Sequence, residues 1–420
     1  MAQPAKASRW TMQDAERYLL GLELFGMRFG LDRMRRLLTA LEQPQDAYPS
    51  VHVVGSNGKS STVRMTAGIL ERHGLRTGAY LSPHLVSFAE RVRVSGEDVS
   101  ADRFAASVQR AAHAAELVDR TLGPDDRVTQ FEALTAAALA ELAAREVDAA
   151  VIEAGLGGRY DATNVLNSSV QVLTNVDLEH TRWLGPTIAD IAAEKADVVK
   201  PGATLVIGPD LHPDALAVAE RVVAEREATL VVAPEAPEAA ALAGYQRRNF
   251  AVARAAAEAF LGELDPDAVA DAALHAAVPG RFELVDAQLV LDGAHNAAGM
   301  EALAASLPGF LQGRPLVAVV SILEDKDAAS MLRTLLPLCE QVVFCRINNP
   351  RALSPATLAS LANQLGGLPG GRVHTERDVH DGVDLARTLA GPDGIVLATG
   401  SIYLLADLLR PQGSGPGATL

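Results

Sequence analysis

The chain has 420 residues, of which 49% are hydrophobic and 21% charged, and its formal net charge is −15. This length favours two domains over a single core, and the acidic balance argues against general electrostatic binding to nucleic acid. The N-terminus has no apolar signal core and no stretch is long enough to span a membrane, so we expect a cytoplasmic protein without a membrane partner.

Periodic apolar residues predict helices and strands that alternate along the chain. The first expected helix begins at Thr11, where Asp14 forms a weak capping box, and its apolar face reaches Phe25. Further helices are expected at residues 31–41, 61–73, 132–145 and 188–199. The expected strands cover residues 51–54, 149–154, 170–175, 204–207, 289–291, 316–320, 341–344 and 395–398. Such alternation predicts a largely parallel sheet covered on both faces, with ligands at the carboxyl ends of its strands.

A second series of strands and helices starts after residues 279–281, so we place a domain boundary near residue 280. The Pro- and Gly-rich tail at residues 411–417 is expected to be flexible. The two predicted domains therefore cover residues 1–279 and 280–420.

The first predicted strand runs into the loop GSNGKSS, residues 55–61. Its backbone N–H groups could wrap phosphate oxygens, and Lys59 could add a positive charge. Ser60 or Ser61 could offer a hydroxyl to Mg²⁺. The alternative is a surface turn that holds a lysine. A β-branched strand before the loop and a helix after it favour nucleotide binding.

Polar residues also follow two further strands. Glu153 precedes GLGGRYDATN, whose glycines would let a substrate or phosphate approach the backbone, but a strand-end charge in solvent is an equal alternative. His180 follows the strand at 170–175, and taken alone it is more often a surface or core histidine than a magnesium ligand. Lys195 lies among charged residues of a helix, where a solvated face is the favoured interpretation.

Several other polar residues have both a functional and a structural interpretation. Arg91 and Arg93 alternate with valines, so they are expected to share a strand face and could bind a carboxylate, or could simply be exposed. Asp161 and Asn164 could cap helices. The segment DGAHN at residues 292–296 again follows a strand and could equally be an N-capped helix start.

Taken together, nine segments resemble the folylpolyglutamate synthase/dihydrofolate synthase family of the Mur-ligase-like ATP-dependent amide ligases. They are GSNGKSS, LSPHLVSFAERVRV, FEALTA, EAGLGGRYDATN, NVDLEHTRWLG, AEKADVVKPG, PGRFE, LDGAHN and TGSIY, in family order. The match runs from about residue 29 to residue 403. The first segment is similar to the family's G-T-N-G-K-G-S, with Ser60 in place of the second glycine. Which of Ser60 and Ser61 faces the metal therefore stays open.

The resemblance implies roles for individual residues. ATP would be bound by Gly55, Ser56, Asn57, Gly58, Lys59, Ser60, Ser61, Asn249, Arg281 and Asp292. The residues linked to one or two Mg²⁺ ions would be Ser60, Ser61, Ser82, Glu153 and His180. Catalysis would depend on Lys59, Glu153, His180, Lys195 and Arg281, and Lys195 matches a lysine that is often carbamylated in the superfamily. The residues around the incoming glutamate would be Arg91, His295 and Ser401.

The resemblance also implies a fold and a reaction. The fold is α/β, with an N-terminal P-loop ATPase domain on a mainly parallel sheet and a smaller C-terminal Rossmann-like glutamate-ligase domain. The partners would be ATP, L-glutamate, and dihydropteroate or tetrahydrofolate forms, in folate biosynthesis and one-carbon metabolism. We expect a monomer. SPHLVSFAERVRV looks more like bifunctional bacterial members than those restricted to chain extension.

In the implied reaction the acceptor carboxylate is phosphorylated by ATP, and the amine of glutamate then attacks the acyl phosphate. One alternative is a Mur ligase that acts on a cell-wall precursor. Such enzymes generally carry an extra N-terminal domain, and only about 50 residues precede the loop here. The other alternative is a non-catalytic nucleotide-binding regulatory protein, against which the set Lys59, Glu153, His180 and Lys195 argues.

Overall fold

The computed structural model describes residues 9–22, 30–366, 368 and 371–411, and divides into two compact units. Unit 1 runs to Ala239 and resumes at Arg248–Ala276, and unit 2 comprises Ala240–Arg247 and the chain from Ala277 onward. Phe25, expected on the apolar face of the first helix, and the tail from residue 412 lie outside the described residues.

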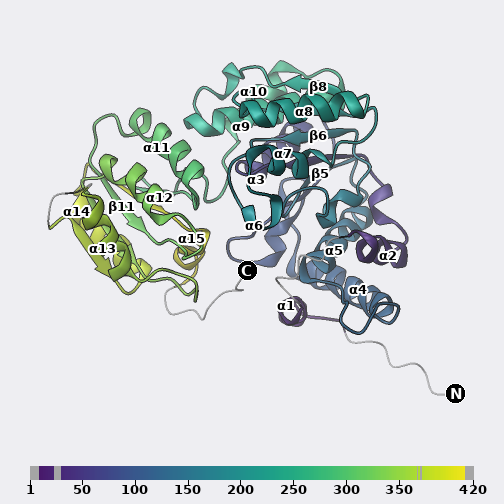
Figure 1. The fold of residues 1–420 in the computed structure, drawn as a ribbon, viewed down its shortest axis with the longest axis horizontal. Helices are drawn as coiled ribbons and strands as arrows, with labels where there is room; N and C mark the ends of the chain where they lie inside the picture. Colours follow the sequence, from purple (N-terminus) through teal and green to yellow (C-terminus); the bar gives the residue numbers. More distant parts are fainter. Residues whose placement is uncertain (1–8, 23–29, 367, 369–370, 412–420) are drawn as a thin grey trace. The chain divides into compact units, whose positions relative to one another are not determined.

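Unit 1 is built on an eight-stranded sheet (Figure 1). Its strands in spatial order are β4 (Glu97–Asp98), β3 (Val92–Val94), β2 (Thr77–Tyr80), β5 (Ala149–Glu153), β1 (Ser50–Val54), β6 (Val170–Leu173), β7 (Thr204–Ile207) and β8 (Thr229–Val232). All pairs from β2 to β8 are parallel, and β3 and β4 add an antiparallel edge. Because β5, β1 and β6 are neighbours, the loops at their carboxyl ends meet at one edge of the sheet.

The helices of unit 1 cover this sheet and one another. They are α1 (Met12–Gly21), α2 (Asp32–Ala40), α3 (Lys59–Arg72), α4 (Ala101–Asp119), α5 (Gln130–Ala144), α6 (Thr181–Leu184), α7 (Ile188–Ala196), α8 (Pro213–Glu225), α10 (Pro266–Leu274) and most of α9 (Gly244–Leu261). Thr11 caps α1 in a capping box with Asp14, as predicted. α3 begins at Lys59, two residues before the predicted start, because Gly58 caps it in a left-handed conformation.

Unit 2 is smaller and has a six-stranded sheet. The strands in spatial order are β13 (Val373–Glu376), β12 (Gln341–Cys345), β11 (Leu316–Val320), β14 (Ile395–Thr399), β10 (Leu289–Leu291) and β9 (Glu283–Leu284), of which only β9 is antiparallel to its neighbour. Its helices are α11 (Ala297–Leu311), α12 (Ala328–Leu335), α13 (Pro355–Leu365), α14 (Val379–Ala390) and α15 (Ile402–Leu409). The first three share a core with one face of the sheet, and α14 packs against β11, β12 and β14.

The α/β fold with mainly parallel sheets is confirmed, and the strands at 204–207, 289–291 and 316–320 have the predicted limits. Five strands were not predicted: β2, β4, β8, β9 and β13. The strand β3 was expected from the alternation of Arg91 and Arg93 with valines. β2 is instructive, because its sequence TGAY has no apolar run. A Cβ on Gly78 would lie 2.7 Å from the side chain of Leu142, so glycine lets α5 pack closely on this strand.

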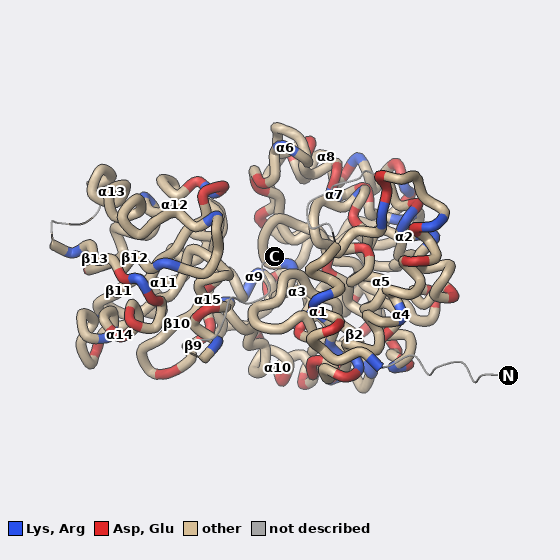
Figure 2. Tube along the Cα trace, turned by 90° about the horizontal axis from the view of Figure 1, so that it is seen from below, with Lys and Arg blue, Asp and Glu red and all other residues tan. Residues whose placement is uncertain are grey.

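Charged residues of both signs are mixed along each unit, as Figure 2 shows. The negative formal charge is therefore spread over the fold rather than gathered in one segment. Across the described ranges, every helix is too short or too polar to cross a membrane.

Candidate functional site

The loop between β1 and α3 is fixed by the segment that follows β6. The N–H groups of Ser56 and Asn57 both donate to Asn175, one to its carbonyl oxygen (3.0 Å) and the other to its Oδ1 (2.7 Å). Thr174 Oγ1 donates to the carbonyl of Asn57 (2.7 Å). Gly55 has a φ of 149°, and a Cβ there would clash with Thr174 Oγ1. Asn175 opens the segment NVDLEHTRWLG, but neither it nor Thr174 was given a role from the sequence, because their place follows from the pairing of β6 with β1.

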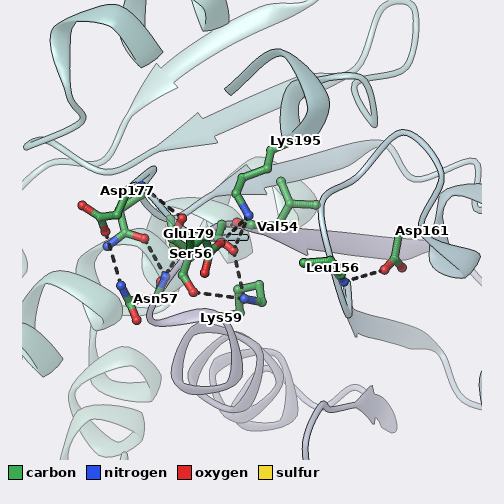
Figure 3. Close-up of polar contacts among 12 residues, drawn as sticks. Val54, Ser56, Asn57, Lys59, Leu156, Asp161, Asp177, Glu179 and Lys195 are labelled. Atoms are coloured by element: carbon green, nitrogen blue, oxygen red, sulfur yellow. Dashed lines mark hydrogen bonds and ion pairs between the residues drawn. The ribbon is translucent and has the colours of Figure 1, made fainter. Parts of the chain in front are cut away.

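Two lysines converge on this loop (Figure 3). Lys59 Nζ donates to the carbonyls of Gly55 (2.9 Å) and Ser56 (3.2 Å). Lys195 Nζ, from α7, donates to the same Gly55 carbonyl (2.9 Å) and to Glu179 Oε1 (2.9 Å). Lys195 is only 1% exposed. The interpretation of Lys195 as part of a solvated helix face is therefore wrong.

The charges of this cluster perturb one another. Burial lowers the pKa of Lys195; Glu179 opposes that shift, and the charge of Lys59 adds to it. Burial alone would raise the pKa of Glu179, but the charges of Lys195 and Lys59 outweigh it and lower that pKa to about 2. Glu179 is therefore ionised at neutral pH, and Lys195 loses its proton more easily than an ordinary lysine.

Glu153, at the end of β5, brings two serines together. Ser60 Oγ donates to its Oε1 (3.0 Å), and the backbone N–H of Ser82 donates to its Oε2 (3.0 Å). Glu153 is 1% exposed, so the alternative of a strand-end charge in solvent is wrong. Carboxylate and hydroxyl oxygens are the donors that Mg²⁺ prefers. Within the described residues no group of three or more His, Cys, Asp and Glu side chains could hold a metal. A metal site here would therefore combine Glu153 with hydroxyl oxygens.

Ser61 and His180 are placed differently from Ser60. Ser61 is 1% exposed, and among the described residues its Oγ has no hydrogen-bond partner. His180 caps the short helix α6 in a left-handed conformation (φ 46°), and its side chain is exposed. Of the two serines, only Ser60 is thus seen to contact Glu153.

Asn249 lies against the loop from α9. A Cβ on Gly58 would lie 2.5 Å from Asn249 Oδ1, and Gly58 has a φ of 82°. Both features require glycine at this position. They place the predicted nucleotide contact Asn249 next to the start of α3, where the helix N-terminus favours anions.

The glycines after Glu153 contact protein. A Cβ on Gly155 would lie 2.5 Å from the ring of Phe131, and one on Gly158 would lie 2.6 Å from the carbonyl oxygen of Lys195. At Gly155 and Gly158 the lack of a side chain therefore serves a contact with protein, and the approach of a substrate or phosphate to this backbone stays a prediction. These glycines let the loop pack closely on α5 and α7, and this packing fixes Lys195.

Asp161 closes the same loop and caps the short helix at Ala162–Val165, as predicted. Its carboxylate accepts from the N–H groups of Leu156 (2.8 Å, Figure 3) and Thr163 (3.0 Å). Thr163 Oγ1 donates to Asp161 (2.5 Å) and lies 2.7 Å from His52 Nε2 on β1. Because the single hydroxyl hydrogen goes to Asp161, His52 carries its proton on Nε2 and donates it.

Arg91 and Arg93 do not lie together on an exposed strand face. Arg91 ends the short helix Phe88–Arg91, is 3% exposed, and its Nε donates to His84 Nδ1 (2.9 Å). Arg93 lies in β3 and pairs with Asp98. The predicted shared face is therefore wrong, because the strand begins only at Val92. The role of Arg91 towards glutamate stays a prediction.

In unit 2, the remaining predicted residues lie at the carboxyl ends of neighbouring strands. Asp292 follows β10 and Ser401 follows β14, and these strands pair in parallel. Ser401 caps α15, and Asn296 caps α11, which confirms the N-capped helix start. His295 Nδ1 lies 2.9 Å from the carbonyl oxygen of Gly293.

Comparison with known sequences places these segments in one family. A family model described as the Mur ligase, glutamate ligase domain matches residues 280–402. The chain is 34% identical to a dihydrofolate synthase/folylpolyglutamate synthase of Mycobacterium tuberculosis, over 89% of this chain and 88% of that protein. It is 32% identical to the protein of the same name from Bacillus subtilis, over 95% of this chain and 98% of the relative.

Solved structures similar to this chain come from the same family. A folylpolyglutamate synthase of Mycobacterium tuberculosis complexed with ADP and AMPPCP has a TM-score of 0.84 at 33% identity, covering 92% of this chain and 96% of that one. A bifunctional folylpolyglutamate synthase/dihydrofolate synthase from Yersinia pestis, complexed with AMPPNP and Mn ion, has a TM-score of 0.82 at 28% identity, covering 97% and 99%. The chain therefore belongs to the dihydrofolate synthase/folylpolyglutamate synthase family.

Proposed function

We propose that the chain is an ATP-dependent ligase that joins L-glutamate to the carboxylate of dihydropteroate and of tetrahydrofolate forms. The observation that carries this proposal is the contact of the buried Glu153 with Ser60 and Ser82, beside the loop between β1 and α3. The two named relatives, which align over most of their length, support it. A cytoplasmic location and a monomeric state stay predictions.

The phosphates of ATP would lie at the loop between β1 and α3. The N–H groups of Ser56 and Asn57 already bond to Asn175, so the amides that face the phosphates would be those at Gly58 and the first turn of α3. Lys59 would exchange its two carbonyl acceptors for phosphate oxygens. This exchange favours ATP, because a phosphate oxygen carries more negative charge than a carbonyl.

Magnesium would be held by oxygen atoms of Ser60 and Glu153, next to Ser82, with His180 and Ser61 as the further predicted ligands. The hydrogen bond from Ser60 to Glu153 supports Ser60 as the serine that faces the metal. The Mn ion bound with AMPPNP in the Yersinia pestis protein supports a divalent metal in this family. When bound, the metal would offset part of the negative charge of the phosphates.

The reaction would have two steps. An oxygen of the acceptor carboxylate attacks the γ-phosphorus of ATP, the bond to the β–γ bridging oxygen breaks, and ADP leaves with the bond's electron pair. The neutral amine of glutamate then attacks the acyl carbon, phosphate leaves, and the amine loses a proton to form the amide. The protein's contribution would be positioning and charge neutralisation by Lys59 and Arg281. Residues 1–279 would bind ATP, and residues 280–420 would add the ATP contacts Arg281 and Asp292. The glutamate contacts would be Arg91 of the first domain with His295 and Ser401 of the second.

Carbamylation of Lys195 is the second part of the proposal. The neutral amine of Lys195 would attack the carbon of CO₂ and release a proton, which leaves a carbamate anion. Two observations support it: the pKa of Lys195 is lowered by burial, and its Nζ lies beside the phosphate loop. The carbamate would carry a negative charge into the cluster and would part Lys195 from Glu179.

Phosphate release with single substrates omitted tests the proposal. Wild-type protein should release phosphate from ATP only when glutamate and a pterin acceptor are both present, with dihydropteroate and with a tetrahydrofolate. Release that depends on a UDP-linked wall precursor would point to a Mur ligase instead. No turnover with any acceptor, together with tight ATP binding, would point to a regulatory protein.

A further inference from the structure

The first turn of α9 bonds to both nucleotide contacts predicted in unit 2. Tyr245 donates its hydroxyl hydrogen to Asp292 Oδ2, and Gln246 Nε2 donates to the carbonyl oxygen of Arg281 (3.1 Å). Both side chains belong to the short segment of α9 that packs with unit 2, while the helix from Arg248 onward belongs to unit 1. Neither residue was identified as functional from the sequence.

Asp292 is the centre of this arrangement and is 2% exposed. Its Oδ2 accepts from Tyr245 and from the N–H of Phe282 (2.9 Å), and its Oδ1 accepts from the N–H of Ala294 (2.9 Å). Burial raises the pKa of Asp292, and the hydrogen bond from Tyr245 is the largest influence in the opposite direction. A buried carboxylate that loses one of its three donors is less well compensated, which is costly.

Asp292 in turn fixes the loop that carries Arg281. Phe282 has a φ of 51°, a left-handed conformation that costs a non-glycine residue energy, and its N–H is held by Asp292 Oδ2. The Tyr245 ring meets the Phe282 ring edge-on, with centroids 6.4 Å apart. The Arg281 NH1 donates to the carbonyl of Gly280 (3.0 Å). It also lies against Gly293, and a Cβ on Gly293 would clash with it.

We propose that Tyr245 is a positioning residue of the nucleotide site, which sets the carboxylate of Asp292 and, through Phe282, the place of Arg281. This inference rests on the proposed function, in which Asp292 and Arg281 contact ATP. Gln246 assists by holding the carbonyl of Arg281. Four residues further along the same helix, within unit 1, Asn249 lies against Gly58.

The Tyr245→Phe variant separates this role from packing, because it keeps the ring that meets Phe282 and removes only the O–H. We expect the KM for ATP to rise roughly tenfold, the size of effect that the loss of one hydrogen bond to a charged group produces. The KM values for glutamate and the acceptor should stay within about twofold. A purely structural role would instead lower Tm and kcat and leave the KM for ATP unchanged.

Tyr48→Phe is the matched control. Tyr48 is buried in unit 1, and its hydroxyl donates to the carbonyl of Leu139 (3.1 Å), far along the chain from the predicted site residues of unit 2. This substitution also deletes one buried hydrogen bond from a tyrosine. It should lower Tm and leave the KM for ATP as in the wild type.

A double-variant cycle with Asp292→Asn completes the test, with AMPPNP affinity by calorimetry and steady-state kinetics as readouts. Tyr245→Phe should weaken AMPPNP binding in the wild-type background and add little in the Asp292→Asn background. Full additivity, an unchanged KM for ATP, or a Tyr245→Phe protein that no longer folds would each overturn the positioning role. A wild-type protein that binds no AMPPNP and turns over no acceptor would overturn the proposed function and this inference with it.

Discussion

Lys59 and Lys195 donate to the same backbone oxygen, the carbonyl of Gly55, each over 2.9 Å. Two ammonium groups at one oxygen repel each other, and Glu179 offsets this by accepting from Lys195 (2.9 Å). The contact links α7 to the loop between β1 and α3. A change in the charge of Lys195 will therefore be felt at Lys59, whose ammonium the proposed reaction needs at the phosphates.

The first prediction concerns Lys195. Wild-type protein in ¹³C-bicarbonate should give a carbamate signal in its ¹³C NMR spectrum, and Lys195→Gln should not. The variant should also lose activity by roughly 10²-fold or more, as when a group that stabilises transition-state charge is removed. Lys200→Gln is the control, because Lys200 bonds to Asn164 instead (2.8 Å). A carbamate signal that persists in Lys195→Gln and vanishes in Lys200→Gln would contradict the assignment.

The second prediction separates the two serines after Lys59. Ser60→Ala should weaken the activation of turnover by Mg²⁺ by roughly 10- to 100-fold, because Ser60 Oγ bonds to Glu153 (3.0 Å). Ser61→Ala should cause a much smaller loss, since the buried hydroxyl that it removes has no hydrogen-bond partner among the described residues. Titration of activity with Mg²⁺ measures both. The reverse order of effects would assign the metal to Ser61.

The third prediction concerns the glycine loop after β5. Gly158→Ala puts a Cβ 2.6 Å from the carbonyl oxygen of Lys195, and backbone atoms cannot rotate away. We expect the free energy of unfolding to fall by about 1–3 kcal/mol, as for other overpacked sites. Gly123→Ala is the control, because no atom lies within 4 Å of its Cβ. Equal urea midpoints for the two variants would show that the loop yields without cost.

The fourth prediction concerns pH and His52. Burial, aided by the charge of Lys200, lowers the pKa of His52 from 6.5 to about 3. As the pH falls, His52 therefore binds a proton at a higher pH in the unfolded chain than in the folded one. The stability that neutral His52 contributes is fully present above pH 6.5 and is lost as the pH falls towards 3. Below pH 6.5, wild type should lose up to about 1.4 kcal/mol per pH unit relative to His52→Gln. Asp161, whose pKa is raised by burial, is present in both proteins, so its own titration contributes to the stability of both.

Urea unfolding of the two proteins at pH 7, 6 and 5 measures this difference. Between pH 6.5 and 5, the free energy of unfolding of the wild type should fall steadily relative to that of His52→Gln. A gap that stays constant over this range would mean that His52 is protonated in the folded state or exposed to water.

Local chemistry accounts for what could be predicted from the sequence. The loop at residues 55–61, the strand at 204–207 and the capping box at Thr11 each depend on a few consecutive residues, and all three are present in the structure. The short and polar strands β2 and β9 escaped prediction, because neither has enough apolar residues to set a period.

The contacts that define the site were out of reach for a different reason. Asn57 and Asn175 are 118 positions apart, and they meet only because β1 pairs with β6. The burial of Lys195 and the bond from Tyr245 to Asp292 likewise depend on packing between elements that are distant in the sequence. A local pattern shows that a residue is polar, but the strand order decides which partner it meets.

Transfer of oxygen from the acceptor to phosphate tests the central claim most directly. The protein is given ATP, glutamate and dihydropteroate labelled with ¹⁸O in its carboxylate. The released phosphate is then analysed by mass spectrometry. If the carboxylate attacks the γ-phosphorus and phosphate leaves from the acyl carbon, each phosphate should carry an ¹⁸O atom from the acceptor. Unlabelled phosphate, with glutamate still joined to the acceptor, would contradict the acyl-phosphate account.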